Sequence, residues 1–147
     1  MEVEQLPRIL VAEDNEDHAY LLRLAFESGD AKSELVFVED GVEAMDYLES
    51  CDSFESLPGL ILLDINMPRM DGFEVLEKVK SSRTFSHIPV VILTSSAREE
   101  DIARVYEKGG CSFVSKPVKF DEFRDVIASF YVYWTQVAKI PKKGTRS

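Results

Sequence analysis

The sequence predicts an α/β fold in which a five-stranded parallel sheet is covered by helices on both faces. Five short apolar runs recur along the chain, and stripes of apolar residues at helical spacing separate them. Strands that alternate with helices are typical of a parallel sheet. The runs are apolar almost throughout, as in strands that are buried on both faces. The length of 147 residues suits one domain with its own hydrophobic core.

The predicted strands are recognised by their apolar residues and by the polar residues that end them. The central strand is the run LILL of residues 60–63, which Asp64 follows directly. The first strand, RILVAE of residues 8–13, closes on two acids, Glu13 and Asp14. The other strands are expected at residues 35–38, 88–93 and 112–115.

Between the strands, apolar residues recur every three or four positions, which predicts helices. Asp40 and Asp71 stand where the second and third helices begin, and each carboxylate can accept an N-cap hydrogen bond. Asp121 and Glu122 fall in the first turn of the last helix, where they suit the positive end of the helix dipole. The five helices are expected at residues 19–27, 41–50, 73–80, 98–108 and 119–138.

The composition indicates a globular protein that binds neither nucleic acid nor membranes. The formal net charge is −10, and a broad acidic surface repels the phosphates of nucleic acid. No apolar run approaches the length of a membrane span, and the acidic N-terminus does not resemble a signal peptide. We therefore expect a cytoplasmic location, where Cys51 and Cys111 form no disulfide and Cys111 is buried.

Polar side chains suited to phosphate chemistry follow four of the five strands. In a parallel sheet the carboxyl ends of the strands lie along one edge, where ligands bind. Three carboxylates that crowd together need a cation, and hard oxygen ligands favour Mg²⁺. A hydroxyl and an ammonium beside them would hold a tetrahedral anion, so the set predicts a phosphoryl-accepting site with Asp64 as nucleophile. The residues expected at this edge are Glu13 and Asp14, then Asp64, Thr94 and Lys116.

These residues and their neighbours resemble the motifs of the response-regulator receiver (CheY-like) family of two-component signalling. The resemblance covers residues 8–138 and implies a flavodoxin-like, doubly wound five-stranded parallel sheet of order 2-1-3-4-5 with five helices. Residues 1–7 are then an N-terminal extension and residues 139–147 a basic tail, with no effector domain. The matching motifs are Glu13-Asp14, Asp64-x-Asn66-Met67-Pro68-x-Met70-Asp71-Gly72, Thr94-Ser95 and Lys116-Pro117.

The resemblance implies a role for each matching acidic residue. Asp64 accepts a phosphoryl group from the phosphohistidine of a sensor histidine kinase. Mg²⁺ is bound directly by Asp14 and Asp64, through water by Glu13, and by the backbone carbonyl of Asn66. Asn66 and Ser96 hold the two positions that tune the lifetime of the phosphate. The protein is then a stoichiometric phosphoacceptor that assists its own phosphorylation and dephosphorylation, and not an enzyme with turnover.

The resemblance also implies a switch. Thr94 and Lys116 contact the phosphoryl group, Ser95 is small enough to leave access to the acid, and the Lys116–Pro117 peptide bond is usually cis. Phe113 occupies the position of the switch aromatic, which is often tyrosine in the family. The resulting change in the fourth helix, the fifth strand and the fifth helix alters a surface for an unidentified downstream partner.

Two other classes of protein stay open. One is a hydrolase or phosphatase with Asp64 as a covalent nucleophile, which a second acid two residues later would favour. Asn66 stands at that place and argues against it. The other is a receiver-like protein-interaction module that is never phosphorylated. The intact set of acids with Thr94 and Lys116 argues against this module.

Within the family, several features resemble the stand-alone receivers that partner phytochrome-type histidine kinases. We therefore expect a kinase of this type as a partner. The features are the run from Asp14 to Asp17, the long loop of residues 51–59, the sequence Ile88-Pro89-Val90 and the pair Tyr133-Trp134.

The last helix carries an apolar stripe that extends beyond the expected sheet. Phe123 and Ile127 are expected in the core, whereas the later residues predict a surface for a homodimer. The alternative is that Trp134 packs back onto the sheet. The predicted dimer surface consists of Tyr131, Tyr133, Trp134 and Val137.

Two features are interpreted without a functional role. His18 and His87 have no partners at ligand spacing, so we expect both on the surface or in a loop. Residues 98–101 (REED) are interpreted as a solvated helix start.

Overall fold

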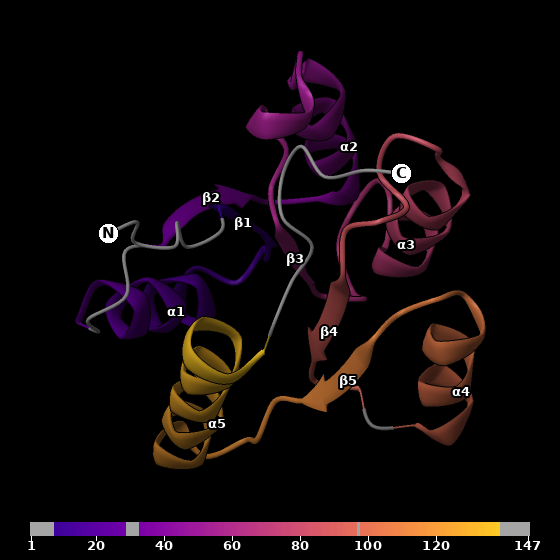
Figure 1. The fold of residues 1–147 in the computed structure, drawn as a ribbon. Coiled ribbons are helices and arrows are strands. Elements are labelled where there is room, and N and C mark those ends of the chain that lie inside the picture. Colours follow the sequence, from indigo (N-terminus) through magenta and orange to yellow (C-terminus); the bar gives the residue numbers. More distant parts are fainter. Residues whose placement is uncertain (1–7, 29–32, 97, 139–147) are drawn as a thin grey trace.

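The computed structural model describes residues 8–28, 33–96 and 98–138, so the predicted extension (residues 1–7) and tail (residues 139–147) lie outside the described residues. The chain forms a five-stranded sheet of order β2-β1-β3-β4-β5 in which all neighbouring strands are parallel (Figure 1). This order confirms the predicted flavodoxin-like topology. The strands are β1 (Arg8–Ala12), β2 (Glu34–Val38), β3 (Leu60–Leu63), β4 (Val90–Thr94) and β5 (Ser112–Ser115).

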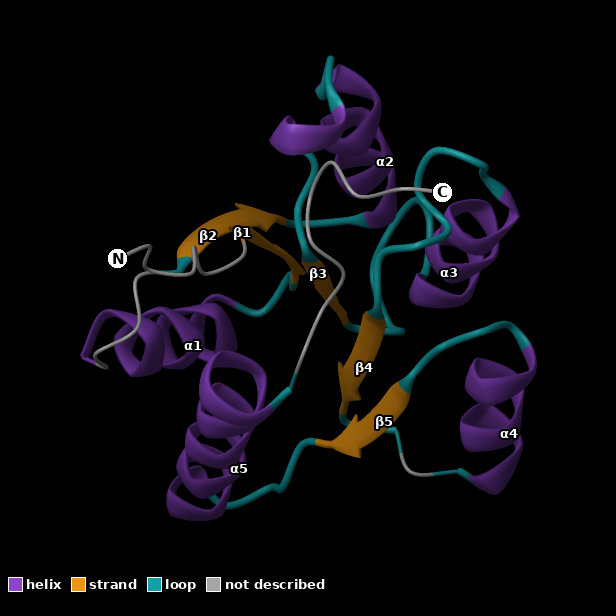
Figure 2. Ribbon diagram, viewed as in Figure 1, coloured by secondary structure: helices purple, strands orange, loops and turns teal. Residues whose placement is uncertain are grey.

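The helices cover both faces of the sheet, as Figure 2 shows. A first core lies between the sheet and α2, α3 and α4, and a second core lies between the sheet and α1 and α5. The central β3 is buried on both faces, which explains its uninterrupted apolar run. The helices are α1 (Glu16–Ser28), α2 (Gly41–Ser50), α3 (Gly72–Ser81), α4 (Glu99–Glu107) and α5 (Phe120–Val132).

Side-chain caps explain where several helices begin. The predicted caps are confirmed: Asp40 accepts the Glu43 N–H at 2.9 Å, and Asp71 accepts the Glu74 N–H at 3.0 Å. The first helix begins at Glu16, three residues earlier than predicted, because the Asn15 side chain accepts two N–H groups of its first turn. This early start brings the first turn of α1 to the carboxyl edge of the sheet.

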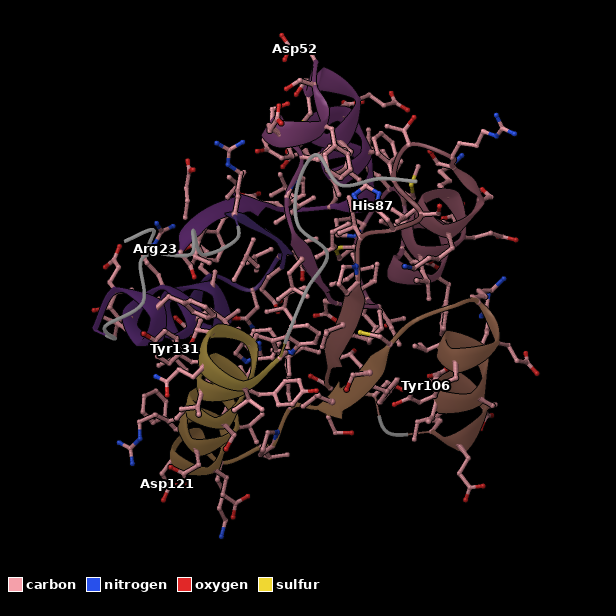
Figure 3. All side chains as sticks on the ribbon, in the orientation of Figure 1. Arg23, Asp52, His87, Tyr106, Asp121 and Tyr131 are labelled. Atoms are coloured by element: carbon pink, nitrogen blue, oxygen red, sulfur yellow. The ribbon has the colours of Figure 1, made fainter. Side chains whose placement is uncertain are left out.

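The end of α5 corrects one prediction about the dimer surface. The helix continues as a π-helical turn (Tyr133–Val137), close to its predicted end. Tyr131, labelled in Figure 3, is only 7% exposed and lies edge-on to Phe26 of α1, with ring centroids 5.1 Å apart. Its place in the predicted dimer surface is therefore wrong, because it belongs to the second core. Trp134 packs partly against that core beside Phe130, as the alternative expected.

Two further observations concern exposed and apolar segments. Cys111 is exposed, so the prediction that it is buried is wrong. The cause is its position immediately before β5, which lies at the edge of the sheet. Among the described residues, no helix is long and apolar enough to cross a membrane.

Candidate functional site

Three carboxylates meet at the carboxyl edge of the sheet, as predicted. Glu13 and Asp14 follow β1, and Asp64 follows β3. Oxygen atoms of the three side chains lie within 4.8 Å of one another. Glu13 and Asp64 are buried and Asp14 is exposed, so the cluster has one side open to solvent. The backbone holds both strand ends, because the Asp64 N–H donates to the Ala12 carbonyl at 3.1 Å.

Lys116 reaches this cluster from the loop between β5 and α5. Its Nζ lies 2.6 Å from Glu13 Oε1 and 3.0 Å from Asp64 Oδ2. The Lys116 side chain is 3% exposed, so the ammonium is removed from solvent and depends on these partners. No peptide bond is cis in the described part of the chain, so the expected cis bond before Pro117 is a wrong prediction. Trans is the commoner isomer of such bonds in folded proteins.

The cluster favours an added cation. Burial raises the pKa of Glu13 to about 7, and the nearby Asp64 charge acts in the same direction against the pull of Lys116. One ammonium faces three carboxyl groups, and their hard oxygen donors fit Mg²⁺. Asn66 is adjacent, since its N–H donates to Asp64 Oδ1 at 3.2 Å. Its side chain is exposed at the surface of the site.

The end of β4 supplies the predicted hydroxyl. Thr94 is fully buried, and its Oγ1 accepts a long hydrogen bond of 3.5 Å from the Ser96 N–H. The exposed Ser95 lies between them. The Ser96 hydroxyl donates to Asp101 on α4 at 2.6 Å, so the loop after Thr94 is tied to the next helix.

Asp101 corrects the interpretation of residues 98–101 as simply solvated. It is only 5% exposed and pairs with Arg98 at 3.2 Å. The Arg98 guanidinium, followed by the Ser96 hydroxyl, holds the pKa of Asp101 below its usual range. At the start of α4, Asp101 is therefore buried in a polar cluster with Ser96 and Arg98, whereas Arg98, Glu99 and Glu100 are exposed.

A tyrosine of α4 contacts β5, the strand that carries Phe113. Phe113 packs partly against the first core, and its backbone N–H donates to the Tyr106 hydroxyl at 3.1 Å. Tyr106 is labelled on α4 in Figure 3. Phe113 has no hydroxyl of its own, but the hydroxyl of Tyr106 on the neighbouring α4 lies beside its backbone.

The loop after Asp64 is held by contacts that the sequence analysis did not predict. Arg69 has a left-handed backbone with φ of 66°, and its guanidinium pairs with Asp40 at 2.8 Å. The Gly41 N–H donates to the Met70 carbonyl at 3.1 Å. These contacts bind the loop after Asp64 to the start of α2, and among the residues involved the sequence analysis predicted only Asp40, as a helix cap.

His18 is a further residue of the site that the sequence analysis did not predict. His18 lies in the first turn of α1 and is half-buried, so it is neither in a loop nor fully exposed, and its Nδ1 lies 2.9 Å from Lys116 Nζ. The ring also lies edge-on to Phe123, with centroids 4.8 Å apart. A signal existed, since His18 falls in the first turn of a helix that begins at the edge where the acids gather. His87 lies in the loop before β4, as expected, with its ring near Phe54.

Two curated proteins are similar in sequence to most of this chain. The chain is 36% identical over 135 residues to the probable methanogenesis regulatory protein FilR2 of Methanothrix harundinacea, which covers 91% of this chain and 87% of that protein. It is 30% identical over 135 residues to the response regulator Rcp1 of Synechocystis, which covers 90% of this chain and 92% of Rcp1.

Two solved structures of response regulators and one family model also match most of this chain. The Mn²⁺-bound form of Rcp1 matches with a TM-score of 0.87 at 30% identity, over 92% of this chain and 99% of that one. The phosphorylated cyanobacterial phytochrome response regulator RcpA matches with a TM-score of 0.86 at 34% identity, over 93% and 99%. The predicted likeness to phytochrome-associated response regulators is confirmed. The model of the response regulator receiver domain matches residues 9–128, and the chain therefore belongs to the response-regulator receiver family.

Proposed function

We propose that this protein is a phosphorylation-controlled response regulator that accepts a phosphoryl group on Asp64 from a sensor histidine kinase. The observation that carries the proposal is the meeting of Asp64 with two further acids and a buried ammonium. Lys116 Nζ is 3.0 Å from Asp64 Oδ2, and the three acids lie within 4.8 Å of one another. Such a set supplies a nucleophile and charge neutralisation, which are what phosphoryl transfer needs.

In the proposed transfer, a carboxylate oxygen of Asp64 attacks phosphorus and the P–N bond to the kinase histidine breaks. The products are an acyl phosphate on Asp64 and a kinase imidazole that regains a proton from solvent. Mg²⁺ held by Glu13, Asp14 and Asp64, with the Asn66 carbonyl, would neutralise charge on the phosphoryl oxygens. Lys116 already donates to Asp64 and would donate to the phosphoryl group instead.

The output would be a change of surface. Thr94 Oγ1 makes only a 3.5 Å hydrogen bond with the Ser96 N–H, so its hydroxyl can be redirected to a phosphoryl oxygen at small cost. Redirecting it would pull on the loop that Ser96 and Asp101 tie to α4. The α4–β5–α5 surface then changes its population of conformations and meets a downstream partner. Asn66 and Ser96 would set the lifetime of the phosphate, and the protein would aid its own dephosphorylation.

The proposal also names partners. RcpA is a phytochrome response regulator, and its 34% identity supports a phytochrome-type kinase here. The exposed Tyr133 and Val137, with the half-buried Trp134, are the parts of the predicted dimer surface that a second copy could reach. A cytoplasmic location follows from the same proposal, because a sensor kinase presents its phosphohistidine there.

The proposal is tested by the chemistry of the phosphorylated protein. Incubation with Mg²⁺ and acetyl phosphate should give a covalent phosphate that hydroxylamine removes, because hydroxylamine attacks acyl phosphates. A phosphate that resists hydroxylamine would lie on a hydroxyl such as Thr94 or Ser95 and would overturn the assignment to Asp64. No covalent phosphate at all would favour the unphosphorylated interaction module.

A further inference from the structure

The ammonium of Lys116 has all of its hydrogen-bonding capacity in use. A lysine ammonium carries three N–H donors and no acceptor. Three acceptors lie within hydrogen-bond distance of Nζ: Glu13 Oε1 at 2.6 Å, His18 Nδ1 at 2.9 Å and Asp64 Oδ2 at 3.0 Å. Because lysine only donates, Nδ1 must be the unprotonated ring nitrogen of a neutral His18. The hydrogen then resides on Nε2.

The His18 backbone and the His18 ring each have a contact that positions them. Its backbone N–H donates to the Asn15 side chain at 3.1 Å, which fixes the residue in the first turn of α1. The ring lies edge-on to Phe123 of α5, at an interplanar angle of 71°. The His18 side chain therefore lies between the first turns of α1 and α5.

The charges around the ring favour its neutral form. Burial first, and then the adjacent Lys116 charge, lower the pKa of His18, while the carboxylates of Asp64, Asp17 and Asp14 act in the opposite direction. Phe123, the contact from α5, carries no charge. A neutral imidazole is what the hydrogen bond to an ammonium requires.

His18 differs from the other two acceptors in one important respect. Glu13 and Asp64 are the proposed ligands of Mg²⁺, and Asp64 is also the proposed phosphoacceptor. Both carboxylates therefore acquire new partners during the reaction. His18 is the one acceptor on Lys116 that neither the metal nor the phosphoryl group takes away.

We propose that His18 is a positioning residue for phosphoryl transfer, whose Nδ1 holds the Lys116 ammonium over the Asp64 carboxylate. The inference rests on the proposed phosphorylation of Asp64. His18 acts through Lys116 and does not touch the phosphoryl group. Lysine has a long flexible stem, and without the third acceptor its ammonium is free to rotate toward whichever carboxylate is available. With His18 in place, the ammonium stays where an incoming phosphoryl oxygen can meet it.

Two variants separate the acceptor from the ring. In His18→Asn, the side-chain Oδ1 stands two bonds from Cβ, as Nδ1 does, so the acceptor is kept and the ring against Phe123 is lost. In His18→Phe, the ring is kept and the acceptor is lost. We expect His18→Phe to slow phosphorylation by acetyl phosphate about tenfold, as loss of a hydrogen bond to a charged group implies. His18→Asn should retain most of the wild-type rate.

The outcomes decide between positioning and packing. If His18→Phe reacts at the wild-type rate, or if His18→Asn loses as much rate as His18→Phe, the positioning role is overturned. Urea unfolding of both variants identifies any loss of rate that comes from instability. A wild type that takes up no phosphoryl group would overturn the proposed function instead.

A second measurement does not depend on phosphorylation. Long-range ¹H–¹⁵N correlation spectra of the metal-free protein identify which ring nitrogen of His18 carries the hydrogen. We expect Nε2 to be protonated and Nδ1 to be free in the wild type, and we expect loss of the Lys116 charge in Lys116→Met to raise the pKa of His18. Protonation of Nδ1 in the wild type would contradict the hydrogen bond on which the inference depends.

Discussion

Gly72, the first residue of α3, lies against the backbone of Asp64, the proposed phosphoacceptor. An added Cβ would overlap the Asp64 carbonyl oxygen and stand 2.8 Å from Ile65 Cα, where ordinary contacts begin at 3.4 Å. The Gly72 N–H also donates to the Ile65 carbonyl at 2.9 Å, so the two segments are tied at this point. Gly72→Ala must therefore push the end of β3 and the start of α3 apart by more than half an ångström.

The magnitude follows from this overlap. Forcing one carbon into a packed site costs about 1–3 kcal/mol, and the better helix propensity of alanine offsets at most about 1 kcal/mol of that. The expected loss in the free energy of unfolding is thus about 1–2 kcal/mol. The loss in phosphorylation rate should be larger, about tenfold or more, because Asp64 itself is displaced from Lys116.

Gly110→Ala is the matched control. Its Cβ would meet the Val105 Cγ1 methyl at 2.5 Å, in the turn before β5 and away from the three acids. Urea unfolding and the rate of phosphorylation by acetyl phosphate should be measured for both variants. Gly110→Ala should lose stability with little change in rate, whereas Gly72→Ala should lose both. A wild-type rate for Gly72→Ala would refute the claim that this backbone contact positions Asp64.

Three further predictions follow from the site and the last helix. In isothermal titration calorimetry, Mg²⁺ should bind saturably to the wild type and to the control Asp17→Asn, and much more weakly to Asp14→Asn. Equal binding by all three proteins would exclude the three carboxylates as the Mg²⁺ site. Folding raises the pKa of Glu13 from 4.5 to about 7, so between these pH values the metal-free folded state binds more protons than the unfolded state. The free energy of unfolding of the wild type, measured relative to that of Glu13→Gln, should therefore fall as the pH rises from 4.5 to 7. A difference between these proteins that is flat or rises with pH would refute this. If the proposed homodimer forms through the last helix, Trp134→Ala should weaken it in sedimentation velocity, and an unchanged profile would remove the last helix as an interface.

The carboxyl edge of the sheet was predictable because local signals mark it. Each strand ends where an apolar run meets a polar residue, and parallel topology brings those ends together. Asp64, Thr94 and Lys116 could thus be placed at one edge without knowledge of any contact. The caps at Asp40 and Asp71 were predictable for the same reason, since a cap acts within four residues.

The contacts that hold the site were not predictable, because they join residues far apart in the chain. His18 and Lys116 are 98 positions apart, and their contact depends on an early start of α1 that only the Asn15 cap explains. The Arg69–Asp40 pair joins residues 29 positions apart, through a left-handed backbone that arginine rarely adopts. Such partners are chosen by tertiary packing and leave no periodic pattern in the sequence.

The position of the phosphate tests the central claim most directly. Intact mass should be measured after incubation with Mg²⁺ and acetyl phosphate, for the wild type beside Asp64→Asn. We predict one phosphoryl group on the wild type and none on the variant, which keeps the shape of the side chain without its nucleophilic carboxylate. An equal adduct on both proteins, or no adduct on either, would contradict the assignment of Asp64 as the phosphoacceptor.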